Sequence, residues 1–124
     1  AAYGEHYDGE YREEAPIKKP HKKYGFKEPI KYFDPSIGIS EIIKVPDNIF
    51  NSKNNVYVAA MGYDLEEGDL SLHHIKFNDK YDKILSEDII PLGDRIRDLL
   101  ILKNEKKIIL YLENNSEIGI LEKL

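Results

Sequence analysis

The stretch NNVYVAAMGYDLEEGDLSLHHIKF, residues 54–77, decides the fold class of this chain. It holds two short runs, 56–61 and 71–77, that are rich in β-branched, aromatic and other apolar residues. Turn-forming residues bound both runs, with Asn54-Asn55 before the first and Glu67-Gly68-Asp69 between the two. Short apolar runs separated by such residues are typical of β-strands joined by turns. The stretch therefore predicts a β-hairpin, and the same pattern can be followed outward from it.

Five further segments repeat this pattern, so the sequence predicts seven strands in all. The other five strands are expected at 37–45, 83–90, 96–102, 107–113 and 117–121. Polar turn signals stand between them, and no helical period intervenes, which indicates an antiparallel meander. The strands group as four and then three. Four-stranded meanders are the blades of β-propellers, so we expect an all-β fold with propeller architecture.

One segment also allows a helix. Leu92, Ile96 and Leu99 have helix-compatible spacing across 89–102, and Asp94 would serve as the N-cap. Against the helix, the run 98–102 is continuously apolar after its aspartate, and the following 107–113 is dominated by Ile and Leu. Buried strands explain both runs better than a helix does.

The grouping of strands predicts three regions. Residues 1–35 are rich in Tyr, Lys, Glu, Gly and Pro and are expected to form an extended lead-in from a preceding blade. Residues 36–91 should form a four-stranded blade, and residues 92–124 a last blade with three strands. The missing fourth strand would come from the far N-terminus of a complete ring.

Composition limits the function classes. The chain has 124 residues with 41% hydrophobic and 33% charged, which suits one folded domain and contains no membrane span. The formal net charge of −5 argues against a mainly electrostatic nucleic-acid binder. No cysteine is present, so disulfides, thiolate nucleophiles and Cys-ligated metals are excluded. The chain begins Ala1-Ala2-Tyr3 with neither an initiator Met nor a signal peptide, which suggests a fragment.

Several motifs, in order along the chain, carry a resemblance to a known family. They are Tyr3-Gly4-Glu5-His6-Tyr7, then Pro35-Ser36-Ile37-Gly38 at the start of a strand, then Arg95-Ile96-Arg97-Asp98, then Leu110-Tyr111, then Gly119 in the last strand. This series resembles the C-terminal portion of the soluble quinoprotein glucose/sorbosone dehydrogenases. The resemblance implies a six-bladed β-propeller, of which this chain covers about the last two blades.

The resemblance also implies an activity for the parent protein. Enzymes of this family oxidise a sugar and pass its electrons to pyrroloquinoline quinone (PQQ), with calcium and a catalytic histidine supplied by earlier blades. The catalytic histidine and the calcium segment would lie outside this chain, so the chain alone is expected to be inactive. Family members are usually periplasmic or secreted.

Three residues of this chain match cofactor-binding positions of the family. Arg95 and Arg97 match its Arg-x-Arg motif, and an arginine fork can hold a carboxylate with two hydrogen bonds. Arginine occurs elsewhere only at Arg12, and residues two apart on a strand point the same way, so both guanidinium groups could converge on one anion. They could equally pair with nearby Asp or Glu. Gly38 falls where the family backbone approaches the cofactor, although a strand bulge explains a glycine equally well.

One departure from the family supports a different function. Gly62 stands where the dehydrogenases usually carry a Lys that helps to hold the quinone, and the acidic stretch 64–69 follows it. The alternative is therefore a propeller without cofactor that serves as a binding or interaction module. A third possibility is a complete small β domain. His73 and His74 are adjacent on a predicted strand, so they face opposite sides and cannot chelate one ion together.

Overall fold

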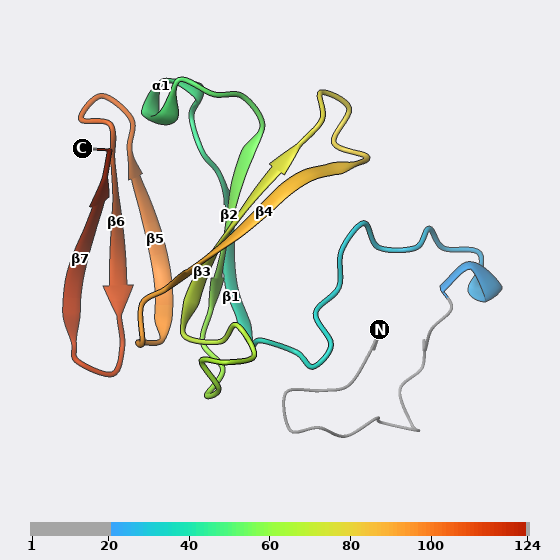
Figure 1. Ribbon diagram of the computed structural model, residues 1–124, viewed down its shortest axis with the longest axis horizontal. Coiled ribbons are helices and arrows are strands. Elements are labelled where there is room, and N and C mark those ends of the chain that lie inside the picture. Colours follow the sequence, from blue (N-terminus) through green and yellow to red (C-terminus); the bar gives the residue numbers. More distant parts are fainter. Residues whose placement is uncertain (1–20, 124) are drawn as a thin grey trace.

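The computed structural model describes residues 21–123, which form two antiparallel sheets that stand side by side (Figure 1). The elements are η1 (His21–Tyr24), β1 (Ile39–Lys44), α1 (Asp47–Phe50), β2 (Asn55–Ala60), β3 (Ser71–Phe77), β4 (Ile84–Pro91), β5 (Ile96–Leu102), β6 (Lys107–Leu112) and β7 (Glu117–Glu122). All seven predicted strands are present, with ends shifted by no more than 2 residues. The segment 89–102 is strand and loop, not helix. Residues 1–20 of the predicted lead-in at 1–35 lie outside the described residues.

Strand order follows chain order in both sheets. The first sheet has the order β1-β2-β3-β4 and the second β5-β6-β7. Short turns connect β3 to β4, β5 to β6 and β6 to β7, whereas the β1–β2 and β2–β3 connections are longer. The connection between β1 and β2 contains a single helical turn, α1, which ends where Asn51 takes a left-handed conformation with φ 50°. Asparagine tolerates that conformation better than most residues do.

The first strand of each sheet carries a β-bulge. In β1 the register shifts between Ile39 and Glu41, and in β5 it shifts between Ile96 and Asp98. An inserted residue breaks the strict alternation of faces. In β5, Ile96 and Leu99 are therefore both buried although they are three residues apart.

The main core lies between the two sheets. It is formed by the buried side chains Val45, Ile49, Tyr57, Ala59, Leu72, Ile96, Leu99, Ile108 and Leu110. All six residues of β2 are buried, because β2 has a strand on each side and side chains packed on both faces. Each fully buried aliphatic side chain contributes about 1.5–3 kcal/mol. This packing fixes the two sheets as one unit.

Polar links tie the sheets together across the same interface. The Ser40 hydroxyl donates to the carbonyl of Ile96 at 2.5 Å, and the Leu99 amide donates to Oε2 of Glu41 at 2.7 Å. Burial, followed by the nearby carboxyl of Asp98, raises the pKa of Glu41. At the other end, Asn48 of α1 donates to the carbonyl of Lys103 at 3.1 Å.

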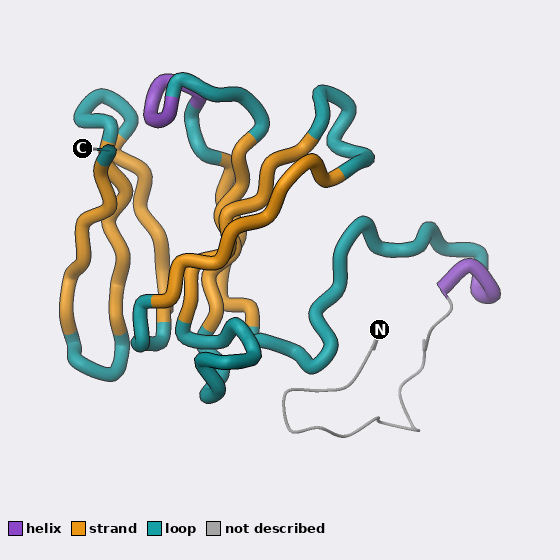
Figure 2. The backbone as a smooth tube through the Cα atoms, in the orientation of Figure 1, coloured by secondary structure: helices purple, strands orange, loops and turns teal. Residues whose placement is uncertain are grey.

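The opposite face of the first sheet receives the segment that precedes β1. Val56, Val58 and Ile75 form a second buried cluster there, and Phe33 packs against it. In the tube view this segment is a loop that starts to one side of the sheets and leads into β1 (Figure 2). The outer face of the second sheet, by contrast, exposes Leu100, Tyr111, Ile118 and Ile120. No helix in the described part of the chain is long and apolar enough to cross a membrane.

Candidate functional site

Four loops meet at one end of the two sheets, the lower end in Figure 1. They are the start of β1 at Gly38, the β2–β3 loop, the β4–β5 loop and the β6–β7 turn. Arg95 lies in the β4–β5 loop just before β5, and Arg97 lies at the bulge of β5. All three predicted cofactor residues therefore belong to this one end.

Arg95 bridges the two sheets. Its Nε donates to the carbonyl of Met61 at 2.9 Å, and its guanidinium lies 5.0 Å from the centre of the Tyr63 ring. A cation over an aromatic face is favourable, so Tyr63 helps to orient the guanidinium plane. Within residues 21–123 the contacts of Arg95 use Nε, and its two terminal amino groups donate to no other side chain. These terminal groups are the donors that Arg95 can offer to an anion.

Arg97 and Arg95 converge on the same carboxylate, Glu113, at the end of β6. Nη2 of Arg97 lies 3.1 Å from Oε1 of Glu113, and Nε of Arg95 lies 3.6 Å from Oε2. Both guanidinium groups do reach one anion, as predicted, and that anion is the Glu113 carboxylate of the chain itself. The two arginines do not converge because of the alternation of side chains along a strand, as was expected. Arg95 precedes the strand, and a bulge intervenes at Arg97.

A second carboxylate, Asp94, holds the two loops in place. It is 2% exposed, and it accepts hydrogen bonds from the amides of Asn114 and Asn115 and from the Asn115 side chain at 2.8, 3.3 and 2.8 Å. A carboxylate with this many donors is fully satisfied when buried. The Glu113 amide also donates to the carbonyl of Arg95 at 2.9 Å. Asp94 thus fixes the β4–β5 loop against the β6–β7 turn and brings Glu113 to the arginines.

Gly38 is required by the packing of the chain itself. Its φ of +63° favours glycine, and an added Cβ would lie 3.0 Å from the backbone nitrogen of Gly62. The amides of Met61 and Gly62 donate to the carbonyls of Gly38 and Ile37, each at 2.9 Å. The strand-bulge interpretation named the wrong position, since the register shift of β1 falls after Ile39. Gly38 instead allows two backbones to touch.

Gly62 is required as well, and the reason is Asp69. A Cβ at position 62 would meet Oδ2 of Asp69 at 2.0 Å and Oδ1 at 2.6 Å. Asp69 is 4% exposed and accepts the amide of Asp64 at 2.9 Å through Oδ2, while Oδ1 is buried without a hydrogen bond. The space next to Gly62, where the family usually places an ammonium group, is thus bordered by a carboxylate.

These residues enclose a small cavity. Its volume is about 130 Å³, and Gly38, Met61, Gly62, Tyr63 and Arg95 line it. Arg97 is half exposed and lies beside the rim through its contact with Glu113. The structure therefore brings Gly38 and Arg95 together in one cavity and places Arg97 next to it.

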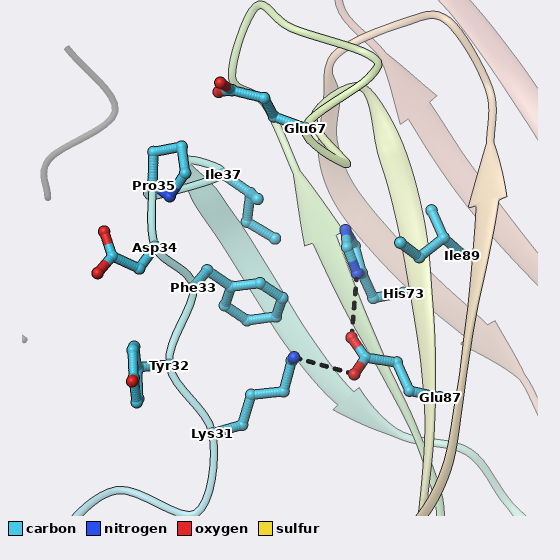
Figure 3. A pocket seen from close by; sticks show the side chains of 10 residues that line it. All are labelled: Lys31, Tyr32, Phe33, Asp34, Pro35, Ile37, Glu67, His73, Glu87 and Ile89. Atoms are coloured by element: carbon cyan, nitrogen blue, oxygen red, sulfur yellow. Dashed lines mark ion pairs between the residues drawn. The ribbon is translucent and has the colours of Figure 1, made fainter. Parts of the chain in front are cut away.

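A larger cavity lies away from the predicted residues, between the segment before β1 and the sheet. Its volume is about 580 Å³, and Figure 3 shows Lys31, Phe33, His73 and Glu87 on its walls. Nζ of Lys31 pairs with Glu87 at 2.9 Å, and the Phe33 ring meets the His73 ring edge-on with centroids 5.2 Å apart. These contacts fasten the segment that leads to Gly38.

His73 contributes to the same fastening from inside the sheet. It is 2% exposed, and its Nε2 lies 2.7 Å from the carbonyl of Gly68, which can only accept, so Nε2 carries the proton. Nδ1 has no hydrogen bond and lies 3.5 Å from Oε1 of Glu87. His74 faces the other side, against Tyr57 and Phe50. The two histidines lie on opposite faces, as predicted from their adjacency.

Comparison with known protein families identifies the family of this chain. A model of the family described as Glucose / Sorbosone dehydrogenase matches residues 1–121. The chain belongs to the glucose/sorbosone dehydrogenase family. No curated protein matches its sequence. The match to the family model confirms the family that the motifs at Pro35 and Arg95 suggested.

A solved structure named "glucose dehydrogenase" is similar in fold to this family member. The TM-score is 0.60 at 17% identity, and the match covers 82% of this chain and 29% of that chain. Likeness at this identity shows the fold, which is the all-β, propeller-type architecture predicted from the strand pattern. The chain spans less than a third of the length of that relative.

Sequence reasoning missed two residues of the site. Glu113 was expected only as the end of a strand, and Asp69 only as part of a turn in the acidic stretch 64–69. The signal for Glu113 was the possibility that the arginines pair with a nearby acid. For Asp69 the only signal was the glycine at position 62, and a glycine does not reveal which atoms occupy the space beside it.

Proposed function

We propose that this chain forms part of a PQQ-dependent sugar dehydrogenase and contributes one rim of its cofactor site. The observation that carries the proposal is the convergence of Arg95 and Arg97 beside the Gly38–Gly62 backbone contact, within a member of the glucose/sorbosone dehydrogenase family. When bound, PQQ would accept the two electrons removed from an aldose. The sugar, the catalytic histidine and the calcium site would belong to other segments of the protein.

The residues present fit one carboxylate of such a cofactor. The terminal amino groups of Arg95 are the donors that suit a planar carboxylate, and Tyr63 and Met61 hold the guanidinium in place. Arg97 would add a second permanent charge on the same side. The cavity of about 130 Å³ that Arg95 lines together with Gly38 and Gly62 leaves space beside the guanidinium. The chemistry of this donor set supports binding of one carboxylate edge.

The proposal is tested on the full-length protein. We expect sugar-dependent dye reduction after loading with PQQ and calcium, and binding of PQQ by equilibrium dialysis. Arg95→Ala and Arg97→Ala should each weaken PQQ binding, by roughly tenfold for a charge-assisted carboxylate contact. Lys107→Ala is the matched control, since this cation pairs with Glu122 outside the site at 3.1 Å. Absence of both activity and PQQ binding would refute the enzyme proposal.

A second candidate function is a propeller that binds a partner without a cofactor. Two observations favour it: Asp69 borders the space where the family usually has a Lys, and Glu113 already pairs with both arginines. The PQQ-binding assay separates the candidates, because a binding module would show no affinity for the quinone in either the wild type or the arginine variants.

We also propose that the two sheets are neighbouring blades of a larger ring, with boundaries at 36–91 and 92–124 and a lead-in at 1–35. The uncovered outer face of the second sheet supports this proposal, because Leu100, Tyr111, Ile118 and Ile120 there have no partner among residues 21–123. A further blade would cover such a face. A periplasmic or secreted location is proposed from the family, and export of a tagged full-length protein would test it.

A further inference from the structure

Glu113 places a carboxylate where a ligand of Arg95 and Arg97 would have to bind. Its Oε1 lies 3.1 Å from Arg97, and its Oε2 lies 3.6 Å from Arg95. Oε2 is buried and accepts no hydrogen bond. Burying a carboxylate oxygen without a donor is costly, so this oxygen is held by charge alone and not by a completed hydrogen bond.

The neighbouring Asp94 shows what a structural carboxylate looks like in this turn. Asp94 accepts three hydrogen bonds from Asn114 and Asn115. The Glu113 side chain accepts one, from Arg97. The part of Glu113 that the sheet needs is its backbone, whose amide donates to the carbonyl of Arg95. The Glu113 side chain could therefore leave the arginines without opening the turn.

We propose that Glu113 is a built-in competitor at this anion site: a ligand carboxylate binds Arg95 and Arg97 by displacing the Glu113 carboxylate. The identity of the ligand as PQQ rests on the proposed function, while the competition rests on the contacts of Glu113. Glu113 is part-exposed, with 28% of its side chain accessible, so the displaced carboxylate can turn toward water. A ligand must replace the contacts of Glu113 with the arginines in order to bind. The site is therefore selective for ligands that offer more than one weak carboxylate contact.

The net charge around the arginines determines how Glu113 affects the affinity for a carboxylate ligand. The three groups in contact, two guanidinium groups and one carboxylate, carry a single net positive charge. An incoming carboxylate meets this single charge while Glu113 stays, and two positive charges once Glu113 has moved away. Removing the charge of Glu113 should therefore raise affinity for carboxylate ligands.

The test compares Glu113→Gln with Glu117→Gln in the full-length protein. Glu117 lies at the start of β7, opposite Leu112, and forms no ion pair with either arginine among residues 21–123, so its substitution makes the same change in net charge without removing a contact to them. Two probes are used in equilibrium dialysis: PQQ, and pyridine-2,6-dicarboxylate as a small planar dicarboxylate. Near-ultraviolet circular dichroism of the tyrosines verifies that each variant is folded. We expect E113Q to lower the Kd for both probes roughly tenfold, and E117Q to change it less than about twofold.

The outcomes of this test separate the proposed role of Glu113 from the proposal that PQQ is the cofactor. If PQQ binds the wild type and E113Q equally, or binds E113Q more weakly, Glu113 is not a competitor, and the quinone proposal is unaffected. If no variant binds PQQ while the dicarboxylate binds E113Q more tightly than wild type, the competitor stands and the cofactor proposal falls. If neither probe binds any variant, including E113Q, both are overturned.

Discussion

The two faces of the β5–β7 sheet carry similar apolar side chains and differ in what covers them. On the inner face, Ile96, Ile108 and Leu110 are buried against the first sheet. On the outer face, Ile118 and Ile120 are 67% and 60% exposed. Residue type alone does not distinguish the two faces. What distinguishes them is the partner sheet and the polar links that come with it.

The difference teaches how the site at the end of the sheets is positioned. The inner interface combines apolar packing with directional bonds from Ser40 and Glu41 to β5. Packing supplies most of the free energy, and the hydrogen bonds fix the register of one sheet against the other. Arg95 and Met61 lie on opposite sides of this interface, so their contact depends on that register.

The largest effect is expected at the centre of the inner interface. Leu72 of β3 is fully buried there, and Leu72→Ala should lower the free energy of unfolding by about 3 kcal/mol through lost burial and a residual cavity. Urea denaturation followed by circular dichroism measures the change. A loss below about 1 kcal/mol would mean that the interface between the sheets is not the main core.

A smaller effect is expected from the polar link at the bulge of β1. Ser40→Ala removes the hydroxyl that donates to the carbonyl of Ile96, and should cost about 1 kcal/mol. Ser36→Ala serves as the control, since the Ser36 hydroxyl contacts the Gly38 amide only weakly, at 3.4 Å. Equal losses in the two variants would show that the link to β5 has no special weight.

The link through Glu41 should depend on pH. Because the pKa of Glu41 is raised in the folded chain, its protonated form is favoured by folding. This contribution to stability is fully present below the ordinary carboxyl pKa and is lost as the pH rises through the raised pKa. Glu41→Gln mimics the protonated form, so it should be more stable than wild type at pH 7 and equal to it in acid. Urea midpoints across pH 3–7 test this; a difference independent of pH would contradict it.

The smallest effect is expected on the outer face. Ile118→Thr should change the stability of the 124-residue chain by no more than about 0.5 kcal/mol, because the side chain is two thirds exposed. In a longer protein with a further blade on this face, the same substitution should cost about 2 kcal/mol. Equal small effects in both would argue against the proposed ring.

Much of the fold could be predicted from the sequence because its signals are local. Glu67-Gly68-Asp69 and Asn114-Asn115 lie in connections between strands, and the apolar runs between such polar segments have the length of strands. The grouping of the strands as four and then three predicted the propeller architecture, and the family motifs agreed with it. The bulge at Arg97 was not predictable, because an extra residue leaves no mark in a run such as 98–102. Leu100 therefore points outward, although a buried strand was expected.

The site could be predicted only in part because its contacts join distant residues. The Arg-x-Arg motif singled out Arg95 and Arg97, which lie together at one end of the sheets. Their partner Glu113 is 16 residues or more away in sequence, and its approach depends on the turn that Asp94 holds. Gly38 was assigned to a ligand or a bulge, and the structure shows a third reason, contact with the backbone of Gly62.

The contact between Asp69 and Gly62 restricts the order in which substitutions can accumulate. Any side chain introduced at position 62 would overlap the Asp69 carboxylate, so a change at 62 requires the Asp69 side chain to move or to be replaced by a smaller residue. Replacing Asp69 first would in turn release the Asp64 amide that it accepts. An engineer who wishes to place a lysine at position 62 must therefore redesign the loop from Asp64 to Asp69 before making that substitution.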